Sequence, residues 1–206
     1  MIKITENVYS LESSKKFNIF LIKGEKNILI DTGFPGNVKK ILEELDGINL
    51  DYILITHHDI DHIGNLVEIQ EAKNCEVYAP YEDIPFITGE KSRPGIKRLL
   101  AKKLKNIPKA ENLKELPEKI SDVTVIKTPG HTPGHVCFLY DDVIFLGDLF
   151  RNEDSIELIN SKMNFDEDLL RESIPKIFEY EIKWFCPTHG EVFEFSDKAK
   201  EEILNL

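Results

Sequence analysis

The amino-acid sequence predicts an α/β protein in which short strands alternate with helical segments. Apolar runs of strand length recur along the chain, and apolar residues at helical spacing separate some of them. Histidine and aspartate cluster directly after several of these runs, where each strand would end. Loops at strand ends can converge while the sheet holds them in place, so this pattern favours a functional site built on an α/β scaffold.

Strand and helix candidates divide the chain into two similar halves. Short apolar runs predict strands over residues 7–11, 18–22, 27–30, 51–55 and 75–79, and again over residues 123–126, 136–140, 143–146 and 182–186. We expect one helix within residues 38–45, where apolar residues have helical spacing, and another from about residue 166 to residue 180. Two such halves suit a pair of sheets packed face to face, and we expect a single domain spanning residues 1–206.

The composition excludes several classes of protein. A formal net charge of −11 disfavours binding to nucleic acid, because neutralising phosphates requires a large cationic surface. The three cysteines are widely spaced and form no Cys-x-x-Cys pair, so we expect buried, reduced thiols and no disulfide framework. Neither a membrane span nor the apolar core of a signal peptide is visible, and we therefore expect a cytoplasmic protein without membrane contacts.

One segment departs from the acidic balance of the chain. Residues 86–109, here called the basic segment, carry one acid, Glu90, against eight basic residues: Lys91, Arg93, Lys97, Arg98, Lys102, Lys103, Lys105 and Lys109. Apolar residues within it have the spacing of one face of an amphipathic helix. Three interpretations stay open: a lid that favours an anionic substrate, a homodimer surface, or a helix whose lysines are merely solvated.

Residues 57–62 carry the clearest sign of chemistry. Four candidate metal ligands follow a strand candidate directly: His57, Asp59, Asp61 and His62. So many polar groups are costly to bury without a cation to pair them, and imidazole and carboxylate are ligands of zinc, iron and manganese. Alternate residues of an extended segment face one way, so the first three side chains can point together, and a turn near Gly64 can bring His62 inward.

Three further motifs place histidine or aspartate beside glycine. They are residues 128–135 (Thr-Pro-Gly-His-Thr-Pro-Gly-His), residues 145–148 (Phe-Leu-Gly-Asp) and residues 187–190 (Pro-Thr-His-Gly). The order of the motifs resembles that of the metallo-β-lactamase superfamily, with its His-x-His-x-Asp-His loop, Thr-Pro-Gly-His loop, Gly-Asp and terminal His-Gly. The turn at residues 31–33 (Asp-Thr-Gly) is similar to an early element of the same family. This resemblance implies the metallo-β-lactamase fold, a four-layer αββα sandwich.

The resemblance also implies a site for two divalent metal ions. Aligned by motif, the ligands are His57, Asp59 and His131 for the first ion, Asp61, His62 and His189 for the second, and Asp148 as the bridge between them. Asp31, His58 and His135 would contact ligands rather than metal. Zinc is the first expectation for both ions, with iron or manganese as alternatives.

The chain departs from the family pattern at Asp59, where the family usually has histidine. His58 cannot replace that histidine, because a shift of one residue turns the side chain to the opposite face. Three carboxylates and a bridging hydroxide would balance the charge of two divalent ions, whereas the usual motif leaves one positive charge in excess. We therefore expect a less acidified water and a site that accepts iron or manganese more readily than the histidine version.

Within the family, the chain looks most like glyoxalase II-type thioesterases and lactonase-like hydrolases. The resemblance implies attack by a metal-bridging hydroxide on an ester, thioester or lactone of a small molecule, with Asp61 positioning water and moving its proton. Two alternatives stay open. One is an iron-dependent oxidoreductase similar to persulfide dioxygenases, which are relatives that bind one iron. Flavo-diiron relatives also perform redox chemistry and carry a carboxylate at the position of Asp59. The other is a metal-stabilised binding module without turnover.

Overall fold

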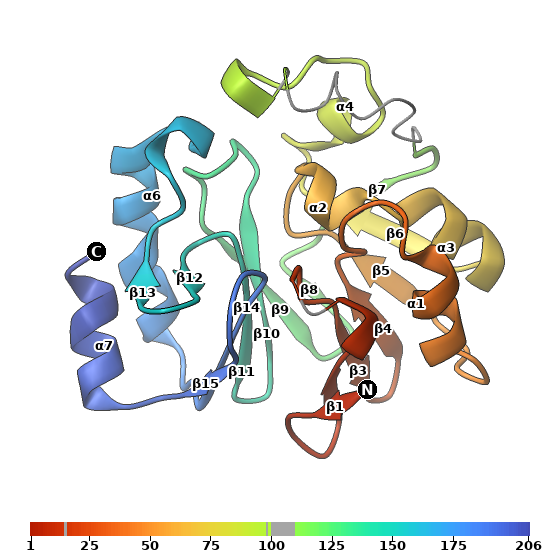
Figure 1. Ribbon diagram of the computed structural model, residues 1–206, viewed down its shortest axis with the longest axis horizontal. Helices are drawn as coiled ribbons and strands as arrows, with labels where there is room; N and C mark the ends of the chain where they lie inside the picture. Colours follow the sequence, from red (N-terminus) through yellow and green to blue (C-terminus); the bar gives the residue numbers. More distant parts are fainter. Residues whose placement is uncertain (15, 98, 100–109) are drawn as a thin grey trace. The chain divides into compact units, whose positions relative to one another are not determined.

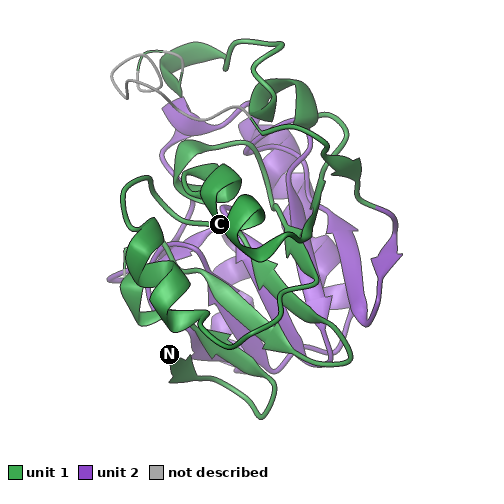
Figure 2. Cartoon of the chain, turned by 90° about the vertical axis from the view of Figure 1, so that its right-hand side faces the viewer, with its two compact units in different colours: residues 1–116 green, residues 117–206 purple. Residues whose placement is uncertain are grey.

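A computed structural model describes residues 1–206 except residues 15, 98 and 100–109. The chain forms two compact units, residues 1–116 and residues 117–206 (Figure 2). Each unit contains a β-sheet and helices, which confirms the expected α/β class. The single domain expected over residues 1–206 stays a prediction. In the described part of the chain, no helix combines the length and the apolar character needed to cross a bilayer.

The first unit is built on a seven-stranded sheet in the order β1-β2-β3-β4-β5-β6-β7 (Figure 1). Its strands are β1 (Ile2–Lys3), β2 (Val8–Ser10), β3 (Phe20–Lys23), β4 (Asn27–Ile30), β5 (Tyr52–Leu54), β6 (Glu76–Ala79) and β7 (Lys114–Glu115). The strands from β1 to β4 pair antiparallel, and those from β4 to β7 pair parallel. Parallel neighbours need crossover connections, and these contain helices α1 (Val38–Glu44), α2 (Ile60–Ile63), α3 (Leu66–Lys73) and α4 (Ile84–Ile87). A 3₁₀ helix, Glu12–Ser14, precedes β3.

Helices α1 and α3 pack on one face of this sheet. A row of buried side chains crosses the sheet in register, formed by Leu21, Leu29, Ile53 and Val77. Ile41 of α1 and Ile69 of α3 belong to the same apolar cluster. The residues of β3 and β4 that face the other side of the sheet are buried as well. This explains why these strands appear in the sequence as continuous apolar runs.

The second unit contains a six-stranded sheet in the order β15-β14-β11-β10-β9-β8 and a separate pair, β12 and β13 (Figure 1). Its strands are β8 (Lys119–Ile120), β9 (Val123–Lys127), β10 (Val136–Tyr140), β11 (Val143–Gly147), β12 (Arg151–Asn152), β13 (Ile156–Glu157), β14 (Trp184–Pro187) and β15 (Phe193–Glu194). Strands β11 and β14 are parallel, and the other neighbours are antiparallel. The helices are α6 (Glu167–Ser173), α7 (Asp197–Leu204) and the 3₁₀ helices Ser161–Met163 and Ile174–Glu179.

The helix expected over residues 166–180 is divided into two parts. It begins as α6, where the Asp166 side chain accepts a hydrogen bond from the backbone nitrogen of Leu169 at 3.0 Å. It continues as the 3₁₀ helix Ile174–Glu179, because Pro175 lacks the backbone N–H that an α-helix would use there. Leu170 and Ile177 from these helices join the apolar cluster of the sheet.

The predicted strands are confirmed in the described residues, whereas several short helices were not anticipated. Helices α2, α3, α4 and α7 fall in segments for which we predicted no helix. The helix expected in the basic segment lies mostly outside the described residues, as do Arg98, Lys102, Lys103, Lys105 and Lys109. Lys91, Arg93 and Lys97 of this segment are described.

The three cysteines are buried free thiols, as expected. Burial raises the pKa of the Cys75 thiol to about 11 and that of the Cys137 thiol to about 12. Burial also raises the pKa of Cys186. These sulfurs therefore stay protonated at neutral pH, and only the thiolate is a strong nucleophile or metal ligand.

Gly130 fixes the loop after β9 against the start of α6. Its backbone oxygen accepts hydrogen bonds from the nitrogens of Phe165 and Asp166, both at 2.9 Å. With φ at +139°, a Cβ at this position would lie 2.3 Å from the backbone nitrogen and Cα of Leu170. The loop that carries His131 therefore requires glycine here.

We expect Gly130→Ala to lower the melting temperature at least about 5 °C more than Gly47→Ala does. Gly47 is the matched control, since it also has a positive φ, +69°, but an added Cβ would meet no atom within 4 Å. The control therefore keeps the cost of a left-handed alanine and removes the clash. Thermal unfolding followed by circular dichroism measures both variants, and equal losses would contradict the steric role of Gly130.

Candidate metal centre

The segment after β5 carries the candidate ligands of the first unit. Its backbone stays extended to Asp59, and helix α2 begins at Ile60. The backbone oxygen of Asp59 accepts hydrogen bonds from the nitrogens of His62 and Ile63, at 3.0 and 3.2 Å. The expected extended run through Asp61 is therefore wrong at its end, because a helical turn and not strand alternation orients Asp61 and His62.

The Asp31 carboxylate organises this segment from the end of β4. One oxygen, Oδ1, accepts a hydrogen bond from the backbone nitrogen of Thr56 at 2.8 Å. The other, Oδ2, lies 2.7 Å from both the Thr56 hydroxyl and His62 Nδ1. Asp31 is thus in contact with the candidate ligand His62, and its orienting role stays a prediction. Its φ of +60° lies in the left-handed region, which aspartate tolerates better than most residues.

These contacts determine which nitrogens of the two histidines are available. A carboxylate can only accept, so His62 donates from Nδ1 to Asp31 and keeps a lone pair on Nε2. The Thr56 hydroxyl gives its single hydrogen to Asp31, and it therefore accepts from His57 Nδ1 at 3.0 Å. Both imidazoles are consequently in the tautomer that can bind a metal ion through Nε2.

The carboxylates of the motif lie beside these histidines. His57 Nε2 is 3.6 Å from Asp59 Oδ2, and both side chains are buried. Asp61, which is half-buried, has a carboxylate oxygen within 4.8 Å of a ring nitrogen of His62. Four side chains of metal-ligand type therefore lie within residues 57–62, a segment that the end of β5 and helix α2 hold in place.

The His58 side chain contacts Asp83 and Phe86. Its Nδ1 and its backbone nitrogen lie 2.8 and 2.9 Å from the same oxygen of Asp83, and Asp83 is fully buried. Its ring stacks on Phe86 with 4.4 Å between the centroids. His58 therefore ties the motif to the start of α4.

In the second unit, the two oxygens of Asp148 face two different histidines. His131 Nε2 is 3.3 Å from Oδ2, and His189 Nε2 is 3.3 Å from Oδ1. His131 donates from Nδ1 to the Asn164 side-chain oxygen at 2.9 Å, which leaves its Nε2 as the acceptor. A carboxylate whose two oxygens each face a histidine Nε2 has the donor arrangement that a bridge between two cations requires.

His135 uses both of its ring nitrogens within the protein. Its Nδ1 lies 2.9 Å from the Thr128 hydroxyl and 3.1 Å from the Thr128 backbone oxygen. Its Nε2 accepts a hydrogen bond from the backbone nitrogen of Asp148 at 3.0 Å. His135 therefore holds the Asp148 backbone, and both of its ring nitrogens have partners within the protein.

Several residues of these networks were missed by the sequence analysis. They are Thr56, Asp83, Thr128 and Asn164, each of which hydrogen bonds a histidine of a motif. The two threonines each stand at the start of a motif, directly after a strand end, which is a usable signal. Asp83 and Asn164 carry no local signal, because their partners lie 25 and 33 residues away in the sequence.

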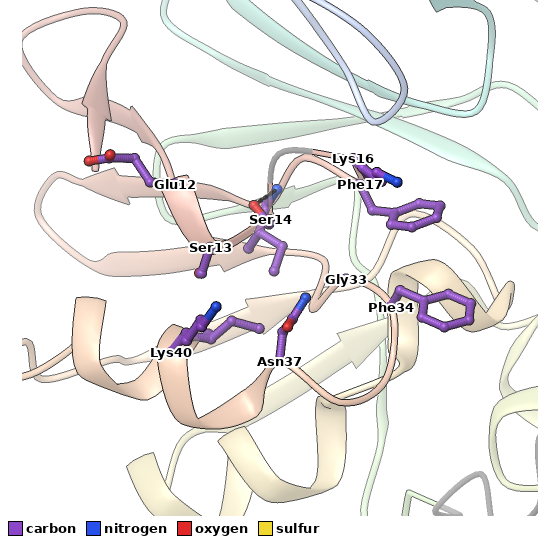
Figure 3. A pocket seen from close by; sticks show the side chains of 11 residues that line it. Glu12, Ser13, Ser14, Lys16, Phe17, Gly33, Phe34, Asn37 and Lys40 are labelled. Atoms are coloured by element: carbon purple, nitrogen blue, oxygen red, sulfur yellow. Dashed lines mark hydrogen bonds between the residues drawn. The ribbon is translucent and has the colours of Figure 1, made fainter.

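A separate pocket of about 370 Å³ lies in the first unit, beside α1 and the 3₁₀ helix Glu12–Ser14 (Figure 3). The rings of Phe17 and Phe34 stack at its edge with 5.4 Å between their centroids. Gly33, which follows Asp31 by two residues, also lines it. None of the candidate metal ligands, all of which are described, lines this pocket.

Comparison with known proteins identifies the family. A family model described as the Metallo-beta-lactamase superfamily matches residues 18–189. The chain belongs to the metallo-β-lactamase superfamily. Membership implies divalent metal ions, which agrees with the histidine and aspartate clusters of the two units. It also supports metal-dependent hydrolysis as the general class of chemistry.

Three relatives show how far the likeness extends. The chain is 34% identical over 143 residues to the probable metallo-hydrolase YflN of Bacillus subtilis (strain 168), covering 59% of this chain and 54% of that protein. It is 30% identical over 191 residues to the probable metallo-hydrolase MJ0888 of Methanocaldococcus jannaschii, covering 85% and 88%. It is 35% identical over 119 residues to the hydroxyacylglutathione hydrolase of Shewanella loihica, covering 55% and 40%. The match thus spans about half of the first relative and less of the third.

Solved structures confirm the metallo-β-lactamase fold. TTHA1623 in a di-iron-bound form superposes with a TM-score of 0.71 and 28% identity, covering 87% of this chain and 90% of that one. The BLEG-1 B3 metallo-β-lactamase superposes with a TM-score of 0.76 and 20% identity, covering 97% and 100%. At that lower identity the likeness to BLEG-1 shows the fold alone.

We expect Asp31→Asn to weaken zinc binding roughly 10- to 100-fold while the protein stays folded. Asparagine tolerates the left-handed backbone, but it cannot accept at both side-chain atoms, so the contacts to Thr56 and His62 cannot all persist. Asp141→Asn is the matched control, because Asp141 also has a positive φ, +51°, and lies in an exposed turn. Competition with a chromophoric chelator measures the affinities, and equal affinities for the two variants would contradict the orienting role of Asp31.

Proposed function

We propose that this protein is a metal-dependent hydrolase that cleaves an ester, thioester or lactone of a small anionic molecule. The observation that supports the proposal is the hydrogen-bonding pattern of the candidate histidine ligands. His57, His62 and His131 have Nδ1 atoms engaged in hydrogen bonds and Nε2 atoms that can bind a metal, and each of these histidines lies next to a carboxylate. The seven proposed ligands are His57, Asp59, Asp61, His62, His131, Asp148 and His189.

The proposed chemistry divides between the ions and the chain. Two divalent ions, when bound, supply an acidified water and withdraw electrons from the carbonyl group of the substrate. Asp148 would contribute one carboxylate oxygen to each ion, because its oxygens face different histidines. Asp61 would accept a proton from the attacking water and deliver it to the leaving group, since it is half-buried and stands in the first turn of α2.

The metal identity is part of the proposal. Zinc suits tetrahedral nitrogen and oxygen donors, and iron suits a site with additional carboxylates. The di-iron form of TTHA1623, at 28% identity, supports iron as a realistic occupant. We propose zinc first and iron or manganese as alternatives.

The substrate class is proposed from the relatives. Hydroxyacylglutathione hydrolases match more than half of this chain, and their name describes the hydrolysis of a thioester of an acidic peptide thiol. An anionic thioester is therefore the first substrate to test.

An iron-dependent oxidoreductase is the second candidate. Asp59 and the di-iron-bound relative favour it, because iron prefers oxygen ligands more than zinc does. Its activity would appear as oxygen uptake with a reduced sulfur substrate. A protein with neither activity would be the non-catalytic, metal-stabilised module.

We expect the wild-type protein to bind close to two divalent ions per chain and Asp148→Asn to bind at most one. The amide cannot bridge two cations, because only one of its two side-chain atoms is an acceptor. Elemental analysis measures the stoichiometry of zinc, iron and manganese, and Asp141→Asn serves as the control. The same preparations are assayed on thioesters, esters, lactones and, for the iron form, oxygen uptake. Oxygen uptake without hydrolysis by the wild-type protein would replace the proposal by the second candidate. Absence of both activities in the wild-type protein would reject catalysis.

We expect Asp61→Asn to lower kcat by roughly 100-fold or more with little change in KM, since a general base contributes about that factor. Metal content is measured in parallel, because Asp61 is also a proposed ligand. The melting temperature is recorded as well, so that a loss of activity through misfolding is distinguished from a loss of the proton-transfer group. Full turnover with both ions present would reject the proton-transfer role.

A further inference from the structure

Two cations of the basic segment contact the metal motif of the first unit. Arg93 donates from Nε and Nη2 to the backbone oxygen of His58, at 3.1 and 2.9 Å. Lys97 Nζ lies 2.6 Å from Asp59 Oδ2, and both side chains are only 7% exposed. The interpretation of the basic segment as a set of solvated lysines is therefore wrong for Lys97.

The environment of Asp59 explains why a cation is needed beside it. His57 Nε2 lies 3.6 Å from Oδ2, and His58 Nε2 lies 3.7 Å from Oδ1. Burial lowers the pKa of Arg93, while the negative charges of Asp59 and Asp83 act in the opposite direction. A carboxylate and an ammonium group that are both buried stabilise each other only as a pair, and removing either leaves an uncompensated charge.

The charges of this pair match a feature of the family pattern. The family usually has a neutral histidine where this chain has Asp59, so the substitution alone adds one negative charge. The ion pair of Asp59 and Lys97 has no net charge, as a neutral imidazole has none. The charge balance expected from the ligands alone is therefore incomplete, because it counts Asp59 and omits Lys97.

We propose that Lys97 is the built-in counter-ion of Asp59, and that the two residues together replace the histidine usual at this position. Lys97 holds Oδ2, the oxygen that also lies 3.6 Å from His57 Nε2, so it acts as a positioning residue and would share that oxygen with a metal ion bound by His57. This inference rests on the proposed ligand role of Asp59. If Lys97 has this role, it stabilises the metal-free protein, and its positive charge weakens the binding of a divalent cation.

A double-mutant cycle tests the proposal with Lys97→Met, Asp59→His and the double variant. Methionine keeps the length and apolar stem of lysine and removes the charge, so a packing role alone would leave the measurements unchanged. Lys114→Met is the matched control, because Lys114 pairs with Glu76 where the two side chains are 51% and 46% exposed. The readouts are the melting temperature in excess chelator and the dissociation constant for zinc.

The expected results follow from the charges. Lys97→Met lowers the metal-free melting temperature by at least about 5 °C and tightens zinc binding at least about tenfold. Asp59→His alone leaves Lys97 without its counter-ion, so it lowers the melting temperature similarly and weakens zinc binding at least about tenfold. The double variant recovers most of the melting temperature and most of the zinc affinity that Asp59→His alone loses. Lys114→Met changes the melting temperature by less than about 2 °C.

Two results would overturn the proposal. One is unchanged or weaker zinc binding by Lys97→Met, and the other is additive losses of melting temperature in the double variant. A wild-type protein that binds no zinc, iron or manganese would instead contradict the proposed function. The melting temperatures in excess chelator are measured without metal. They therefore test the pairing of Lys97 with Asp59 even if the wild-type protein binds no metal.

Discussion

The buried carboxylate of Asp31 is the interaction on which the first set of candidate ligands depends. It holds the backbone and hydroxyl of Thr56 and the ring of His62 at once, from the end of a neighbouring strand. A buried carboxylate is costly without such partners, so the network must form completely or not at all. Strand β4, the end of β5 and helix α2 are therefore locked together by side chains and not only by the sheet.

The second unit solves the same problem with different chemistry. There a neutral imidazole, His135, takes the central position, and it joins the Thr128 hydroxyl to the backbone of Asp148. Both units thus use a threonine at a strand end to fix a histidine ring, at Thr56 and at Thr128. A hydroxyl suits this position because it can donate and accept together, which lets it relay one orientation to the next group.

The sequence predicts the strands and the candidate ligands well, because both have local signals. Apolar runs mark the strands, and the motifs that follow them contain each histidine and aspartate of the two clusters. Helix α2 escapes prediction because its four residues are too short for a periodic pattern. The pairing of Lys97 with Asp59 escapes for another reason: it joins two segments 38 positions apart, and sequence spacing gives no sign of such a contact.

The hydrogen bond between His131 and Asn164 has an implication for how relatives of this chain lose function. Asn164 lies outside every recognisable motif, so a descendant can replace it and keep all of its ligands. Such a protein would still match the family along its whole length, yet its histidine would lose the hydrogen bond that fixes Nδ1. Genetic drift at unremarkable polar positions could thus silence a member of the family while its signature stays intact, and surveys that count ligands would score it as active.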